Sequence, residues 1–146
     1  MSDLRIRQIQ FETETWKRVL YYLMDENSLL KNRLSEVLKD ASLNSFLNNA
    51  EQFQTRFLSL DEDISFLRHH LANLEKLFIK SSNMDDKIME MMSHLEAVQK
   101  NMIHVEIEFS QLRYDFNQSL MNHYTVLMSS TDQEQKLTDN KEFKKI

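Results

Sequence analysis

The chain has 146 residues, and its 18 Lys and Arg against 23 Asp and Glu give a net charge of −5 with histidine neutral. It contains no Gly, no Pro and no Cys. These absences exclude tight hairpin sheets, glycine-rich phosphate loops, disulfide frameworks and thiol chemistry, because each needs one of the missing residues. The mild acidity argues against broad nucleic-acid binding. We therefore expect an all-α protein.

The first predicted helix covers about 4–39. Apolar residues recur there at heptad spacing, which predicts one buried seam. Its two series are Ile9, Trp16, Leu23, Leu30, Val37 and Ile6, Thr13, Leu20, Asn27, Leu34. Further apolar residues beside the seam favour packing against two other helices. Asn27 has two interpretations: a polar residue that sets the register, or a weak point in the seam. If it is buried, its amide needs a polar partner.

The second predicted helix covers about 43–79 and has the clearest repeat. All members of both series are apolar: Leu43, Ala50, Phe57, Ile64, Leu71, Phe78 and Phe46, Phe53, Leu60, Leu67, Leu74. Extending the first helix's register would place core residues at 41 and 44, two positions before Leu43 and Phe46, where the series of the second helix begin. This slip is neither a stutter nor a stammer, so it predicts a break near 39–45, with Ser42 as N-cap.

The third predicted helix covers about 84–128. Its two series are Met84, Met91, Val98, Val105, Leu112 and Ile88, Leu95, Met102, Phe109, Phe116. After Phe116 the seam shifts to Leu120, Tyr124 and Leu127, as in a stutter. Asn83 is a candidate N-cap, but a stammer would also permit one continuous helix through 80–84, and both alternatives stay open. The polar stretch 129–146 predicts a mobile tail or a short frayed helix.

Three long helices joined by short turns predict an elongated antiparallel three-helix bundle, or coiled coil, with up-down-up topology over 1–128. Large side chains on the seams are the expected core anchors: Trp16, Phe53, Phe57, Phe109 and Phe116. The longest unbroken apolar run, 19–24, is too short to span a membrane.

The sequence shows no catalytic constellation, so we expect neither an enzyme nor a cofactor. The Glu-x-x-His spacing of ferritin-like metal sites is absent. Glu90 and His94, four residues apart, are the best candidate metal ligands, and His104 lies two residues before Glu106. Most of these side chains are expected on solvated helix faces. The methionines are better explained by core packing than by metal binding.

Several apolar residues fall outside the predicted seams. Ile103, Ile107 and Tyr114 are spaced by four and seven, which places them along one outer face of the third helix. Phe66 and Tyr22 are further exposed candidates. Such a stripe is a candidate interaction surface for a second copy of the chain or for a helix of another protein.

The first half of the chain contains four segments that suggest a resemblance: Glu14-Thr15-Trp16, Arg33-Leu34-Ser35-Glu36-Val37, Glu51-Gln52-Phe53-Gln54-Thr55-Arg56-Phe57 and 64–70. In these segments the chain resembles a family of short, uncharacterised bacterial helical proteins. It implies a bacterial, cytoplasmic protein and no known activity, so no functional residue carries over. Spectrin-type repeats share the three-helix outline but only a first-helix Trp.

The sequence thus favours a non-enzymatic structural or protein-interaction module that scaffolds or self-associates through an outer apolar helix face. The alternative is a helical-bundle metal-binding or redox-related protein that uses His, Glu and Met side chains. A chain without Cys is compatible with a reducing cytoplasm, where we expect it to be located.

Overall fold

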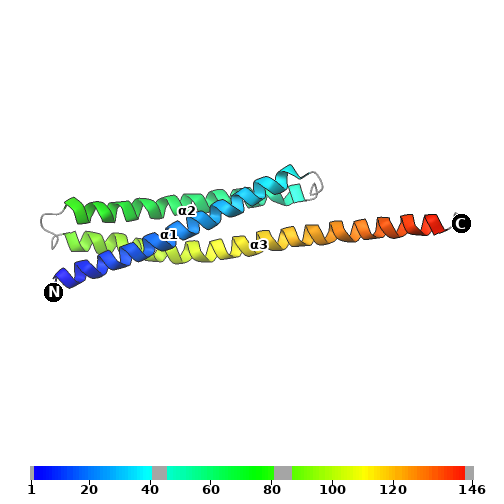
Figure 1. Cartoon of the computed structure of the whole chain (residues 1–146). Coiled ribbons are helices and arrows are strands. Elements are labelled where there is room, and N and C mark those ends of the chain that lie inside the picture. The colour runs from blue at the N-terminus through cyan, green and yellow to red at the C-terminus, as the bar shows by residue number, and fades with distance from the viewer. Residues whose placement is uncertain (1, 41–45, 81–86, 144–146) are drawn as a thin grey trace.

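The computed structural model describes residues 2–40, 46–80 and 87–143. These residues form three α-helices and no strand: α1 (Ser2–Lys39), α2 (Leu47–Lys80) and α3 (Ile88–Phe143). Each helix packs against both others, and the α2–α3 contact is the most extensive (Figure 1). The predicted all-α bundle is confirmed. Within the described helices, none combines the length and apolarity that a membrane span requires.

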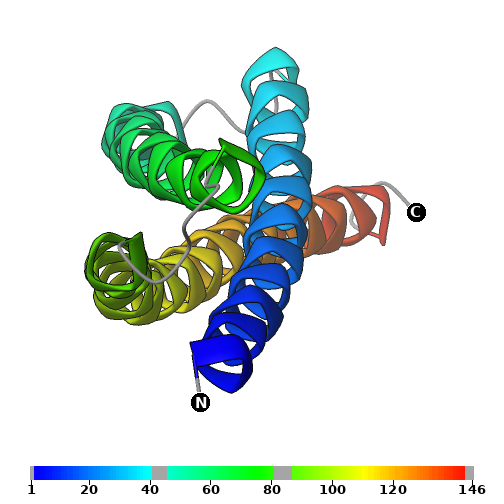
Figure 2. The same cartoon turned by 90° about the vertical axis from the view of Figure 1, so that its left-hand side faces the viewer.

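The helices run up, down and up along the bundle. α2 and α3 lie side by side in opposite directions, so the chain reverses between Lys80 and Ile88 and the alternative of one continuous helix is excluded (Figure 1). α1 crosses this antiparallel pair obliquely, which the end-on view shows most clearly (Figure 2). Because it crosses obliquely, α1 covers the apolar seams of both α2 and α3.

The heptad seams form one continuous core. The predicted anchors Phe53, Phe57, Phe109 and Phe116 are buried, whereas Trp16 is only partly buried and packs against the margin of the core. Phe116 lies at the centre of an aromatic cluster, with ring centroids 5.4, 5.8 and 6.1 Å from those of Phe53, Phe57 and Phe46. His123, at the stutter, packs edge-on against Phe46 at 5.3 Å. The period of seven therefore identified the buried face of all three helices.

Asn27 is buried in the α1 seam, with 1% of its surface exposed. Its Nδ2 donates a hydrogen bond of 2.7 Å to Asp61 Oδ1 on α2, and Lys31 Nζ binds the other oxygen of that carboxylate at 2.9 Å. This bond joins α1 to α2 at one axial position, which supports the interpretation that Asn27 sets their register. The Oδ1 of Asn27 has no hydrogen-bond partner among the described residues. The unpaired buried oxygen costs some stability, as expected for a polar residue that sets helix register.

Three predicted helix ends differ from the structure. α2 begins at Leu47 rather than near residue 43, and α3 begins at Ile88 rather than near residue 84. The candidate caps Ser42 and Asn83 lie outside the described residues. α3 continues to Phe143, beyond the predicted end at 128, where a mobile tail was expected. The stretch 129–143 is polar but holds no Gly or Pro, and its two Gln, two Glu, two Lys and one Leu favour helix. Loss of the apolar pattern marks the end of the bundle, not of the helix.

Candidate functional site

The outer face of α3 carries a second line of apolar side chains. Ile103, Ile107 and Tyr114 are exposed, Ile107 with 64% and Tyr114 with 61% of its surface. Met121 and Met128 are also exposed and continue the spacing of seven from Tyr114. We call these five residues the outer seam. Sequence reasoning missed the two methionines because it assigned Met to the core, although counting in sevens from Ile107 finds both.

The C-terminal part of the outer seam, from Tyr114 to Met128, has few charged neighbours, whereas Ile107 lies between Glu106 and Glu108. From Ser110 to Met128 the only Asp, Glu, Lys or Arg are Arg113 and Asp115. Arg113 lies over the Phe109 ring at 5.5 Å, and Asp115 pairs with Arg56 of α2 at 2.9 Å. Apart from Tyr114, the exposed uncharged residues between Ile107 and Met121 are Ser110, Gln111, Asn117 and Gln118, and the exposed charged ones are Glu108 and Arg113. Depletion of charge around exposed apolar side chains is typical of the centre of a protein interface.

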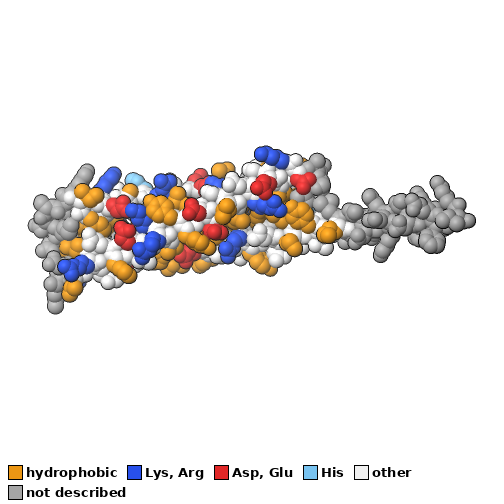
Figure 3. All heavy atoms as spheres, viewed as in Figure 1, with side chains coloured by type: hydrophobic (Ala, Val, Ile, Leu, Met, Phe, Trp, Pro, Cys, Tyr) orange, Lys and Arg blue, Asp and Glu red, His pale blue; other side chains and the backbone are white. Residues whose placement is uncertain are grey.

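The other two candidate surface residues do not belong to this seam. Phe66 is exposed on α2, and its ring packs edge-on against His70 with centroids 4.5 Å apart. Tyr22 is exposed on α1. Elsewhere the surface mixes apolar patches with charged side chains along the bundle (Figure 3). Scattered exposed apolar residues of this kind are normal.

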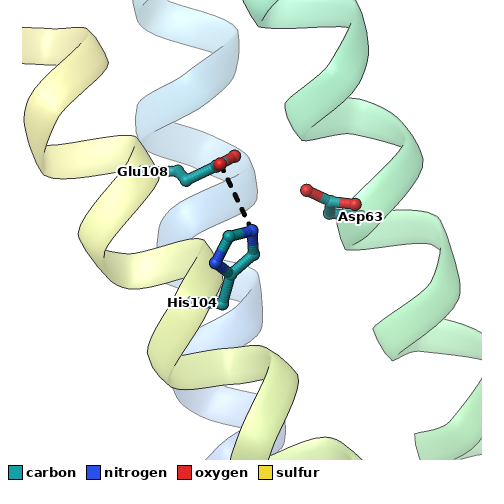
Figure 4. A group of neighbouring side chains, drawn as sticks. All are labelled: Asp63, His104 and Glu108. Atoms are coloured by element: carbon teal, nitrogen blue, oxygen red, sulfur yellow. Dashed lines mark ion pairs between the residues drawn. The ribbon is translucent and has the colours of Figure 1, made fainter.

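A polar cluster lies at the edge where α2 meets α3. Asp63 extends from α2 toward His104 and Glu108 of α3 (Figure 4). The potential ligand atoms of the three side chains all lie within 4.8 Å of one another, and His104 Nε2 is 3.2 Å from Glu108 Oε1. His104 and Glu108 share a helix face because they are four residues apart. Sequence reasoning compared His104 with Glu106 instead, and nothing in it aligned Asp63 with α3.

One heptad along α2 from Asp63, a histidine pair joins the same two helices. His70 Nδ1 lies 3.0 Å from His94 Nδ1, so one ring nitrogen donates and the other accepts. The structure therefore does not bring together the predicted metal ligands Glu90 and His94. Glu90 pairs with Lys87 at 3.6 Å, while His94 faces His70.

Comparison with protein-family models, curated proteins and solved structures found no match. The resemblance to short bacterial helical proteins stays a prediction, and functional inference rests on these surfaces.

The histidine pair predicts a pH dependence of stability. Burial, and then the neighbouring His94 and His69, hold the pKa of His70 below its usual value of 6.5. The unfolded chain therefore takes up this proton at a higher pH than the folded one. The stabilising contribution is complete above pH 6.5 and is lost as the pH falls through the lowered pKa.

We expect urea unfolding to show a fall in stability as the pH is lowered below 6.5, and a smaller fall in His70→Asn. His69→Asn, which changes the exposed neighbour, should keep most of the wild-type dependence. An equal pH dependence in wild type and His70→Asn would contradict this assignment.

Proposed function

We propose that the protein is a non-enzymatic structural or protein-interaction module that self-associates through the outer seam of α3. The observation that carries this proposal is the spacing of Ile107, Tyr114, Met121 and Met128, which are exposed and seven residues apart. Apolar side chains at this spacing form a straight line that fits the corresponding line of another helix. The seams already buried in the bundle follow the same rule.

A second copy of the chain is the partner that this surface fits. The four side chains are evenly spaced, so the line has the same spacing in either direction along the helix. Two antiparallel α3 helices would therefore place Ile107 opposite Met128 and Tyr114 opposite Met121. The two-fold axis would pass beside Asn117 and Gln118. Such an isologous contact is the commonest way in which soluble proteins assemble.

Charge and shape are compatible with this pairing. Two chains of net charge −5 repel each other, but from Ser110 to Met128 the only charged residues are Arg113 and Asp115, and they have opposite signs. α3 also projects beyond the ends of α1 and α2, which leaves its C-terminal part open to a partner (Figure 1). We expect this module to act in the cytoplasm, where a chain without Cys is compatible with the reducing environment.

Light scattering of the purified protein tests self-association. We expect twice the monomer mass for wild type and the monomer mass for Tyr114→Asp, with unchanged helical circular dichroism, because one buried charge at each symmetric position breaks the contact. Leu29→Asp is the matched control, since Leu29 is equally exposed (61%) but lies on α1. It should remain dimeric.

A wild-type monomer at high protein concentration would refute self-association, as would a dimer that Leu29→Asp disrupts and Tyr114→Asp does not. A monomer whose outer seam instead binds a helix of another protein would make the chain an adaptor rather than a self-assembling scaffold.

A further inference from the structure

We propose that Asp63, His104 and Glu108 bind a divalent transition-metal ion of the Zn²⁺ type between α2 and α3. The three potential ligand atoms already lie within 4.8 Å of one another (Figure 4). Zinc bonds of 2.0–2.2 Å place two tetrahedral ligand atoms about 3.4 Å apart. The His104–Glu108 separation of 3.2 Å matches this spacing, so only Asp63 has to move closer. Small side-chain rotations are sufficient for that, because none of the three side chains is locked in the core.

The charges in the cluster favour a cation. Two carboxylates face each other with one imidazole between the helices. Among the described residues Asp63 forms no ion pair with Lys or Arg. By contrast Asp115, on the same α2–α3 edge, is paired with Arg56, which lies seven residues before Asp63 on α2. On this edge one carboxylate is therefore neutralised by an arginine, and the next has no Lys or Arg partner among the described residues and is open to a bound cation.

The donor set indicates which cation. One imidazole nitrogen and two carboxylate oxygens suit Zn²⁺, Co²⁺ or Mn²⁺, while the absence of thiolate disfavours Cu⁺. Imidazole also disfavours the hard ions Mg²⁺ and Ca²⁺, which take oxygen ligands. Three protein ligands leave a fourth tetrahedral position for water or for an external ligand. Because the ligands come from two helices, the ion would bind the folded protein much better than the unfolded chain.

Titration calorimetry with Zn²⁺ alone tests the proposal on the full chain. We expect one ion per chain in wild type and at least a tenfold weaker affinity in His104→Asn, because even supporting residues around a metal contribute about that much. His94→Asn is the matched control: it removes another imidazole of the α2–α3 edge and should leave Zn²⁺ affinity unchanged. Replacing Zn²⁺ by Mg²⁺ should give no comparable binding.

Thermal unfolding gives a second readout that does not depend on calorimetric heats. Zn²⁺ should raise the unfolding midpoint of wild type and of His94→Asn, but not that of His104→Asn or Asp63→Asn. The proposal is overturned by the absence of Zn²⁺ binding to wild type, by equal binding to all variants, or by loss of binding in His94→Asn alone, which would place the ion at the His70–His94 pair. None of these results depends on self-association through the outer seam.

Discussion

Phe116→Ala is expected to lower the free energy of unfolding by about 3–5 kcal/mol, the usual cost of emptying a fully buried phenylalanine site. Phe116 has no exposed surface and contacts the rings of Phe46, Phe53 and Phe57. Alanine removes all three ring contacts at once and leaves a cavity between α2 and α3. Domains of this size are stable by about 5–15 kcal/mol, so the change takes a large share of the total. Urea denaturation followed by circular dichroism measures it.

Phe11→Ala is the matched control for this prediction. It makes the same chemical change on α1, but Phe11 has 65% of its surface exposed. We expect its unfolding free energy to stay within about 0.5 kcal/mol of wild type. Comparable losses for the two variants would mean that the aromatic cluster around Phe116 does not stabilise the bundle.

Asn117→Cys is expected to convert the protein almost completely into a disulfide-linked dimer under mild oxidation. In the proposed antiparallel pair the two-fold axis passes beside residue 117, so each Asn117 faces its own copy. Disulfides form when Cα atoms are about 4.4–6.8 Å apart, which residues beside such an axis can reach. The chain contains no native Cys, so the introduced thiol is the only one that can react. Non-reducing gel electrophoresis measures the yield.

Two further cysteine variants distinguish the antiparallel pair from a parallel one. In the antiparallel pair Ile107 faces Met128, which lies about 31 Å along α3 from Ile107. Ile107→Cys alone should therefore stay unlinked, whereas a mixture of Ile107→Cys and Met128→Cys should form the mixed dimer. Efficient linking of Ile107→Cys to itself would indicate parallel helices. Lys76→Cys, on the exposed surface of α2, should stay unlinked in either case.

The buried face of each helix could be predicted because heptad spacing depends only on residues close together in sequence. Even the polar seam positions Thr13 and Asn27 proved to be buried. Thr13 is accommodated because its hydroxyl donates to the backbone carbonyl of Ile9 at 2.7 Å. Asn27 is accommodated by Asp61, thirty-four residues away, and the partner could not have been named from the sequence.

Contacts between the helices were beyond prediction for the same reason. Asp63 meets His104, and His70 meets His94, only because α2 and α3 align at one axial position. That position depends on how the connection after Lys80 reverses the chain and on how the aromatic cluster around Phe116 packs. Heptad spacing determines which face of each helix is buried, but it does not determine the axial offset between neighbouring helices. The outer seam was partly predicted, since it needs no such alignment.

The length of α3 has a mechanical consequence. Its 56 residues against the 34 of α2 make it longer by about 33 Å. An uninterrupted helix without Gly or Pro bends little over such a distance, so α3 acts as a stiff strut that holds its Phe143 end clear of the rest of the molecule (Figure 1). In the proposed two-fold pair, the two Phe143 residues would lie at opposite ends of the paired α3 helices.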